Sequence, residues 1–146
     1  MSDVEKNKLI IHTSWLFEAI NVQYRSILHD VEKCCLYTQF KTSQMFGSFV
    51  KNLKLSSVLI IQGERNFTNI IKNHSLSQKL VQNVYNLYIK RSIYQERMAY
   101  EFLNNLKYDA KIYNSQELKK IYAKMYNLSN LLSQLDNNFF NFHEII

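Results

Sequence analysis

The stretch LKKIYAKMYNLSNLLSQLDNNFFNFHEII, residues 118–146, decides the fold. Apolar side chains return through it at alternating intervals of three and four residues: Leu118, Ile121, Met125, Leu128, Leu132, Leu135, Phe139, Phe142 and Ile146. This spacing is the seam of a coiled coil, because it keeps one side of an α-helix apolar over successive turns. Lys124, Asn130 and Gln134 lie off the seam. The stretch therefore predicts a long amphipathic helix whose apolar side needs a partner.

Helical spacing also marks the rest of the chain. A helix is predicted from about Val4 to about Leu53, and its clearest seam is Ile20, Tyr24, Ile27, Val31 and Cys34. A second helical segment begins near Leu80, with a seam formed by Leu80, Val84, Leu87, Tyr94, Met98, Phe102 and Leu106. Both patterns follow the period of an α-helix rather than the alternation of a β-strand.

Turn-forming residues are scarce. The 146 residues include no proline and only two glycines, Gly47 and Gly63. A β-sandwich or a doubly wound α/β fold reverses direction many times, and those reversals usually use proline and glycine. The length suits one domain with a core of its own. We therefore expect a single all-α domain over residues 1–146.

The favoured arrangement is an antiparallel coiled-coil hairpin of two long helices. Its turn is expected near 54–58, where Ser56 or Ser57 could cap the following helix. At 1.5 Å per residue the two arms would be roughly 75 Å and roughly 130 Å long. The C-terminal part of the second arm would then project beyond the first and expose its apolar seam to partners.

A compact bundle of four or five helices is the alternative. Further turns could lie at 73–77 and at 114–115, and Asn114 with Glu117 three residues later resembles a capping box. The high apolar content, 47%, favours this bundle because it provides enough material for a core.

No motif for catalysis, cofactor binding or metal binding stands out. The four histidines are scattered without metal-ligand spacing, and no glycine-rich phosphate loop or nucleophile elbow occurs. Arg25 and His29 allow one enzymatic rival, a helical RNA-cleaving enzyme. Cys34 and Cys35 cannot build a disulfide framework, which favours a reducing cytoplasm. We therefore expect a protein that is not an enzyme and has no cofactor or metal.

The net charge of +6 suggests a nucleic-acid partner at first. The basic residues are scattered singly, however, whereas tracking a phosphate backbone usually needs a basic stripe. We therefore expect no nucleic acid as partner. No apolar run approaches the roughly 20 residues of a membrane helix, so contact with a membrane is expected only at its surface.

The chain resembles the FliJ family, the small soluble component of the bacterial flagellar type III export apparatus. The resemblance covers the whole chain and rests on its length, the two-helix plan and the position of the turn. Tyr37 and Phe40 match an aromatic patch late in the first helix, and Phe67 and Ile71 match a pair early in the second. The chain departs from the family at the positions of His74 and Gln78.

The resemblance implies a non-enzymatic role in protein export, flagellum assembly, motility and chemotaxis. The implied partners are the export ATPase ring, the membrane-embedded export gate and export chaperones. Docking to the gate would use Tyr37, Phe40, Phe67 and Ile71, and insertion into the ring would use Leu128, Leu132, Leu135 and Phe139. The implied location is the cytoplasm, including the cytoplasmic face of the inner membrane. The alternative function is a compact helical chaperone or a regulatory module that binds another protein.

Overall fold

Helices make up the regular structure of the computed structural model, which describes residues 3–34, 44–106 and 116–145. The elements are α1 (Asp3–Cys34), α3 (Gln44–Lys72), α4 (Gln78–Val84), the π-helical turn η1 (Tyr85–Ile89), α5 (Lys90–Asn105) and α7 (Gln116–Ile145). No strand occurs in these ranges, so the all-α prediction is confirmed.

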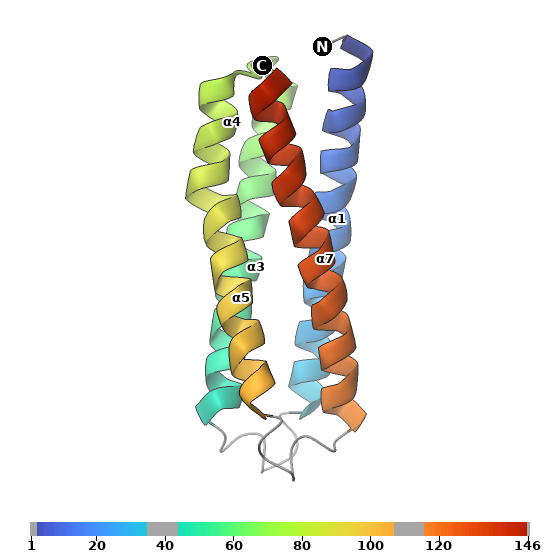
Figure 1. Ribbon diagram of the computed structural model, residues 1–146, viewed down its shortest axis with the longest axis vertical. Helices are drawn as coiled ribbons and strands as arrows, with labels where there is room; N and C mark the ends of the chain where they lie inside the picture. Colours follow the sequence, from blue (N-terminus) through green and yellow to red (C-terminus); the bar gives the residue numbers. More distant parts are fainter. Residues whose placement is uncertain (1–2, 35–43, 107–115, 146) are drawn as a thin grey trace.

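The described helices form four rods that lie side by side, with α4, η1 and α5 stacked end to end as one rod (Figure 1). Neighbouring rods run alternately up and down. Most contacts join α1 to α7 and α3 to the α4–η1–α5 rod, and fewer join these two pairs to each other. The described residues thus form four rods, whereas the favoured hairpin has two unequal arms.

The two clearest seams lie in the core. Ile20, Tyr24, Ile27 and Val31 of α1 are all buried. Every seam position of α7 from Leu118 to Phe142 is buried as well. The side chain of Cys34 and all of Ile146 lie outside the described residues. Apolar spacing alone therefore located the core-facing sides of both helices.

The turn expected near 54–58 is wrong. Helix α3 continues through these residues, and Ser56 is buried in its interior rather than placed at a helix end. The Ser56 hydroxyl donates to the backbone oxygen of Ser92 in the facing rod at 2.7 Å. A serine that satisfies its hydroxyl in the core can remain mid-helix, so it does not mark a boundary.

The chain reverses instead at 73–77. The amide of Ser75 donates to the Ile70 carbonyl at 3.0 Å, and that of His74 donates to Ile71 at 3.1 Å. This is the Schellman pattern, with His74 in the left-handed region at φ 52°. Ser77 then caps α4 by accepting a hydrogen bond from the amide of Leu80 at 3.2 Å. Free carbonyl groups at the end of α3 and a free amide at the start of α4 thus have hydrogen-bond partners, which makes a sharp reversal possible.

The seam expected between Leu80 and Leu106 is also partly wrong. Leu87 and Tyr94 are more than half exposed, whereas Ile89, Ser92 and Glu96 are buried. For Tyr94 the cause is the π-helical turn η1, which inserts an extra residue into one turn and rotates everything that follows it about the helix axis. Leu80 and Leu87 lie before or within η1, and their exposure is independent of that rotation. A constant period of 3.6 residues cannot anticipate that rotation.

The two glycines of α3 give a matched pair of predictions. A Cβ at Gly63 would lie 2.9 Å from Ile89 Cδ1 and 3.0 Å from Tyr88 Cβ, whereas a Cβ at Gly47 meets nothing within 4 Å. Gly63→Ala should lower the free energy of unfolding by about 1–3 kcal/mol, because the rod carrying η1 must move away. Gly47→Ala should raise it by about 0.5–1 kcal/mol through helix propensity alone.

Urea unfolding of both variants tests this pair. Because the chemical change is identical, a similar effect at both sites would show that η1 does not approach α3 as closely as the structure places it.

Candidate functional site

Most residues expected to bind partners lie in the core. Tyr37 and Phe40 fall outside the described residues. Ile71 is partly buried, and five others are almost completely buried: Phe67, Leu128, Leu132, Leu135 and Phe139. The structure therefore covers these five side chains with the chain's own helices.

The apolar seam of α7 is not a projecting surface, which corrects that expectation. Helix α7 has 30 residues and its main partner α1 has 32, so the two rods match in length. Asn138 of α7 donates to the Thr13 hydroxyl of α1 at 3.1 Å, near one end of the pair. Near the other end, Lys124 forms an ion pair with Asp30 at 2.6 Å. The partner that the seam requires is thus supplied within the chain.

A layer of buried polar side chains crosses the middle of the bundle. Tyr24 of α1, Ser56 of α3 and Ser92 of α5 are all completely buried. The hydroxyls of Tyr24 and Ser56 are hydrogen bonded to each other. The Ser92 hydroxyl donates to the Ser56 backbone oxygen at 2.9 Å, which links the two facing rods in both directions.

Glu96 extends this layer toward α7. Its carboxylate, in a residue only 2% exposed, accepts a hydrogen bond from the Ser129 hydroxyl of α7. Burial raises the pKa of Glu96 above its ordinary value, although the Ser129 hydrogen bond lowers it. Burial also raises the pKa of Tyr24, and the negative charge of Glu96 raises it further. All four rods thus contribute to one polar layer.

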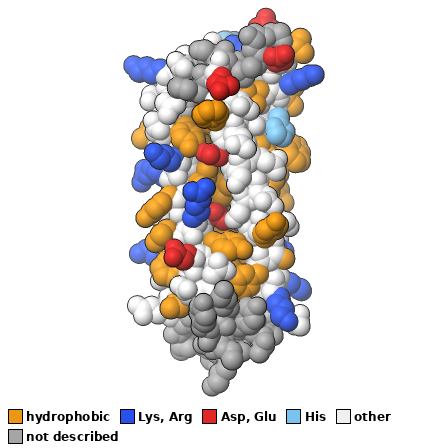
Figure 2. Space-filling view, viewed as in Figure 1, with side chains coloured by type: hydrophobic (Ala, Val, Ile, Leu, Met, Phe, Trp, Pro, Cys, Tyr) orange, Lys and Arg blue, Asp and Glu red, His pale blue; other side chains and the backbone are white. Residues whose placement is uncertain are grey.

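A surface groove opens over Glu96 between α5 and α7. It has a volume of about 370 Å³, and its lining includes Glu96, Ser129, Arg97, Tyr100 and Tyr126. Figure 2 shows this face of the bundle, where acidic, basic and hydrophobic side chains are interspersed along the line between α5 and α7. The groove combines aromatic rings with a buried carboxylate, which suits contact with a polar or basic group.

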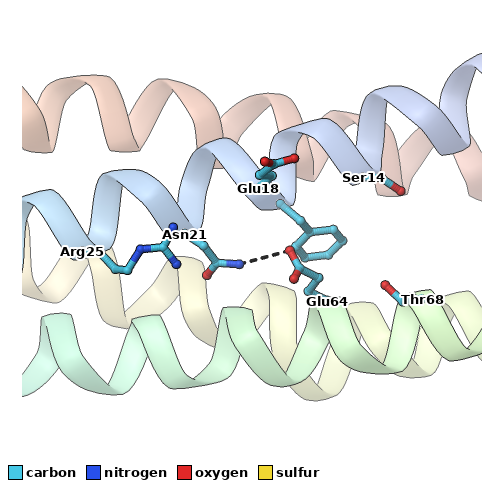
Figure 3. A pocket seen from close by; sticks show the side chains of 7 residues that line it. Ser14, Glu18, Asn21, Arg25, Glu64 and Thr68 are labelled. Atoms are coloured by element: carbon cyan, nitrogen blue, oxygen red, sulfur yellow. Dashed lines mark hydrogen bonds between the residues drawn. The ribbon is translucent and has the colours of Figure 1, made fainter.

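A second groove of about 280 Å³ lies between α1 and α3. Figure 3 shows Asn21 of α1 and Glu64 of α3 pointing toward one another across it, joined by a hydrogen bond of 3.1 Å. Burial raises the pKa of Glu64, whereas the Asn21 hydrogen bond lowers it. Arg25 lies one turn along α1 and lines the same groove. This hydrogen bond joins α1 to α3, in addition to the contact between the rings of Phe17 and Phe67.

The two residues considered for an RNA-cleaving enzyme lie on the surface of α1. Arg25 and His29 are both exposed and lie four residues apart on one helix. Arg25 lines the α1–α3 groove beside Glu64. Within the described ranges, no group of three or more His, Cys, Asp or Glu side chains is arranged to hold a metal ion. Among the helices described, none is both long and apolar enough to cross a bilayer.

Sequence reasoning missed the polar layer, although a signal for it exists. Counting backward from Leu106 in steps of three and four leads to Leu103, Ala99, Glu96 and Ser92. All five of these positions are buried. Serine and glutamate at seam spacing normally face solvent, so the spacing alone does not predict that Ser92 and Glu96 are buried.

The burial of Glu96 should make the stability of the protein depend on pH. Its pKa is raised in the folded protein, so the folded state holds a proton at pH values where the unfolded chain has lost it. The stability that comes with this bound proton is fully present below the pKa of Glu96 in the unfolded chain. It is lost as the pH rises through the pKa of Glu96 in the folded protein. Glu96→Gln keeps the acceptor for Ser129 and removes the charge. It should therefore raise the melting temperature at pH 7 and lose that advantage near pH 4.

Thermal unfolding of the wild type and Glu96→Gln from pH 4 to pH 8 checks this expectation. Glu101→Gln is the control, because Glu101 lines the same groove but is exposed. An equal response of the two variants would contradict the burial of Glu96.

Comparison with known proteins gives no relative. The chain matches no protein-family model, and neither a curated protein nor a solved structure is similar enough to count as a match.

Proposed function

We propose that this chain is a non-enzymatic component of the bacterial flagellar type III protein export apparatus, coupling the export ATPase to the membrane gate. The proposal joins the FliJ-like sequence features to one structural observation, the register of the helix pairs. In this role the protein would act in the cytoplasm and at the cytoplasmic face of the inner membrane.

In both helix pairs, hydrogen-bonded residues occupy nearly mirror positions about one reversal of the chain. Hydrogen-bonded pairs between α1 and α7 include Thr13 with Asn138 and Ser26 with Lys124. In the α3–α5 pair, Ser56 bonds to Ser92. All three pairs are nearly symmetric about Ser75, in the reversal at 73–77. These three pairs face one another across the reversal at 73–77 rather than across the turn near 54–58 on which the resemblance rests. The antiparallel pairing of the two halves of the chain is the observation that carries the proposal.

Two of the residues expected to dock to the gate, Phe67 and Ile71, lie in the described ranges, and Ile71 is the more accessible to a partner. It lines a groove of about 610 Å³ between the start of α1 and the end of α3, together with Ile10, Ile11 and Leu76. Lys6 and Asp3 line the same groove. An apolar floor with charged residues at its edge is typical of protein-binding sites. We assign contact with the export gate to this groove.

Pull-down with the export ATPase and the export gate tests the proposal. The wild type should bind, and Ile71→Asp should lose gate binding because a carboxylate would occupy the apolar floor. Asn69→Asp is the matched control, since Asn69 is exposed on the same turn of α3 and does not line this groove. Absence of wild-type binding to both partners would remove the export function.

A compact helical chaperone or regulatory module is the second candidate. The side-by-side arrangement of the four described rods favours it. Pull-down separates the two candidates, because only the export protein should bind the export ATPase or the gate. Small-angle scattering tests the four-rod arrangement itself, because a compact chain of this length has a radius of gyration of ~15 Å. A value far above this would remove the groove that Ile71 lines.

A further inference from the structure

Helix α1 carries a second apolar stripe on its outer surface. Val4, Ile11, Trp15 and Val22 are 63%, 69%, 55% and 51% exposed. Large apolar side chains that are scattered singly over a surface need no explanation, whereas an ordered stripe indicates a contact. These four are the exposed large apolar residues of α1.

The stripe has the spacing of a coiled-coil seam. The exposed residues Lys8 and Glu18 fill the gaps in it, so that Val4, Lys8, Ile11, Trp15, Glu18 and Val22 follow one another at intervals of four and three. At about 100° per residue, the stripe lies nearly opposite the buried seam that contains Ile20 and Tyr24. Helix α1 thus has one seam for its own bundle and another that faces outward.

We propose that the outer stripe pairs with the same stripe of a second copy of this chain, the two α1 helices running antiparallel about a two-fold axis. The stripe is symmetric about Thr13 in sequence. Antiparallel pairing therefore sets Val4 against Val22 of the second copy and Ile11 against its Trp15. The same pairing sets Lys8 against Glu18 of the second copy, and the two-fold axis repeats each contact.

Charge determines the direction of pairing. In a parallel arrangement Lys8 would face Lys8 and Glu18 would face Glu18, and like charges across an interface are costly. Neither Lys8 nor Glu18 forms an ion pair with another described residue. Both charges therefore remain available to the second copy. Charged residues in an otherwise apolar seam commonly fix register and partner choice.

The contact is small. The stripe spans about 27 Å of helix, which is one helix–helix contact and lies at the low end of specific interfaces. We therefore expect a reversible dimer with a dissociation constant on the order of micromolar. The ring of His12 is stacked on that of Trp15, with centroids 5.9 Å apart and an interplanar angle of 14°. This stack helps to hold the indole in place at the centre of the interface.

Trp15 provides the readout, because it is the only tryptophan in the chain. Over a concentration series through the micromolar range, its emission should move to shorter wavelength as the indole leaves water. Sedimentation should show the mass doubling over the same range. A chain that stays monomeric throughout, with unchanged emission, would overturn the proposal and leave the stripe to another occupant, such as a different helix or a lipid surface.

Charge reversal tests the pairing itself. Lys8→Glu and Glu18→Lys should each raise the dissociation constant about tenfold, since each places like charges at two symmetric contacts. The double variant, and an equimolar mixture of the two single variants, should restore dimerisation. Lys54→Glu, the same charge change at an exposed position of α3, is the control and should have no effect. Failure of the double variant and the mixture to restore dimerisation would overturn antiparallel pairing.

The proposal does not depend on the export function. Loss of dimerisation in the single charge variants, with gate binding retained, would leave both proposals standing. Ile11 of the stripe lines the same groove as Ile71, so dimerisation of Ile71→Asp is measured as well. Loss of gate binding in that variant with dimerisation retained would again leave the α1 stripe proposal standing.

Discussion

Replacing Phe67 with alanine should lower the free energy of unfolding by about 3–5 kcal/mol. Phe67 lies on α3 and is 1% exposed. Its ring lies 5.8 Å from that of Phe17 on α1, 5.7 Å from Phe139 and 5.6 Å from Phe142, both on α7. The side chain therefore joins α3 to both members of the other helix pair. Its loss leaves a cavity at a junction where the two pairs make relatively few contacts.

Urea unfolding measures this effect, with Thr68→Ala as the control. Thr68 is the next residue of α3 and is exposed, so its replacement should change stability by no more than about 0.5 kcal/mol. The family resemblance assigns Phe67 a docking role instead. If Phe67→Ala kept full stability and lost only gate binding, the ring would face a partner and the core contacts described here would be wrong.

Apolar spacing predicted the strongest parts of the fold because those parts obey a constant helical period. The seam of α7 is an example, since every position from Leu118 to Phe142 is buried as the spacing requires. Its pairing with α1 could not be predicted in the same way. A seam shows that a partner is needed, but its identity depends on where the chain reverses. Misplacing the turn at 54–58 instead of 73–77 gave α7 no partner and made its seam appear exposed.

The candidate site was harder to predict than the fold. The groove over Glu96 depends on residues from α5 and α7, and the polar layer beneath it depends on all four rods. The π-helical turn η1 rotates α5 so that Ser92 and Glu96 face inward and Tyr94 faces water. Such a turn has no simple sequence signature. Ser56 illustrates the same difficulty, because a serine can cap a helix or bond across a core with equal chemical justification.

Leu132→Asp is the second change with a large expected effect. Leu132 is 1% exposed in the middle of the α7 seam. A carboxylate placed there would lie among apolar side chains with no partner for its charge, which typically costs about 3–5 kcal/mol. Because a small domain is stable by only about 5–15 kcal/mol, the variant should lose much of its helix signal on mild heating at pH 7. Lowering the pH should restore part of the stability, since a protonated carboxyl is less costly to bury.

Asn130→Asp introduces the same carboxylate two residues earlier on the same helix. Asn130 is exposed, so that variant should differ from the wild type by no more than about 0.5 kcal/mol. Circular dichroism during heating at pH 5 and pH 7 compares the two variants directly. The contrast isolates burial, because both positions share one helix, one added charge and nearly the same neighbouring sequence. Equal losses at the two positions would mean that the side of α7 assigned to the core does not face it.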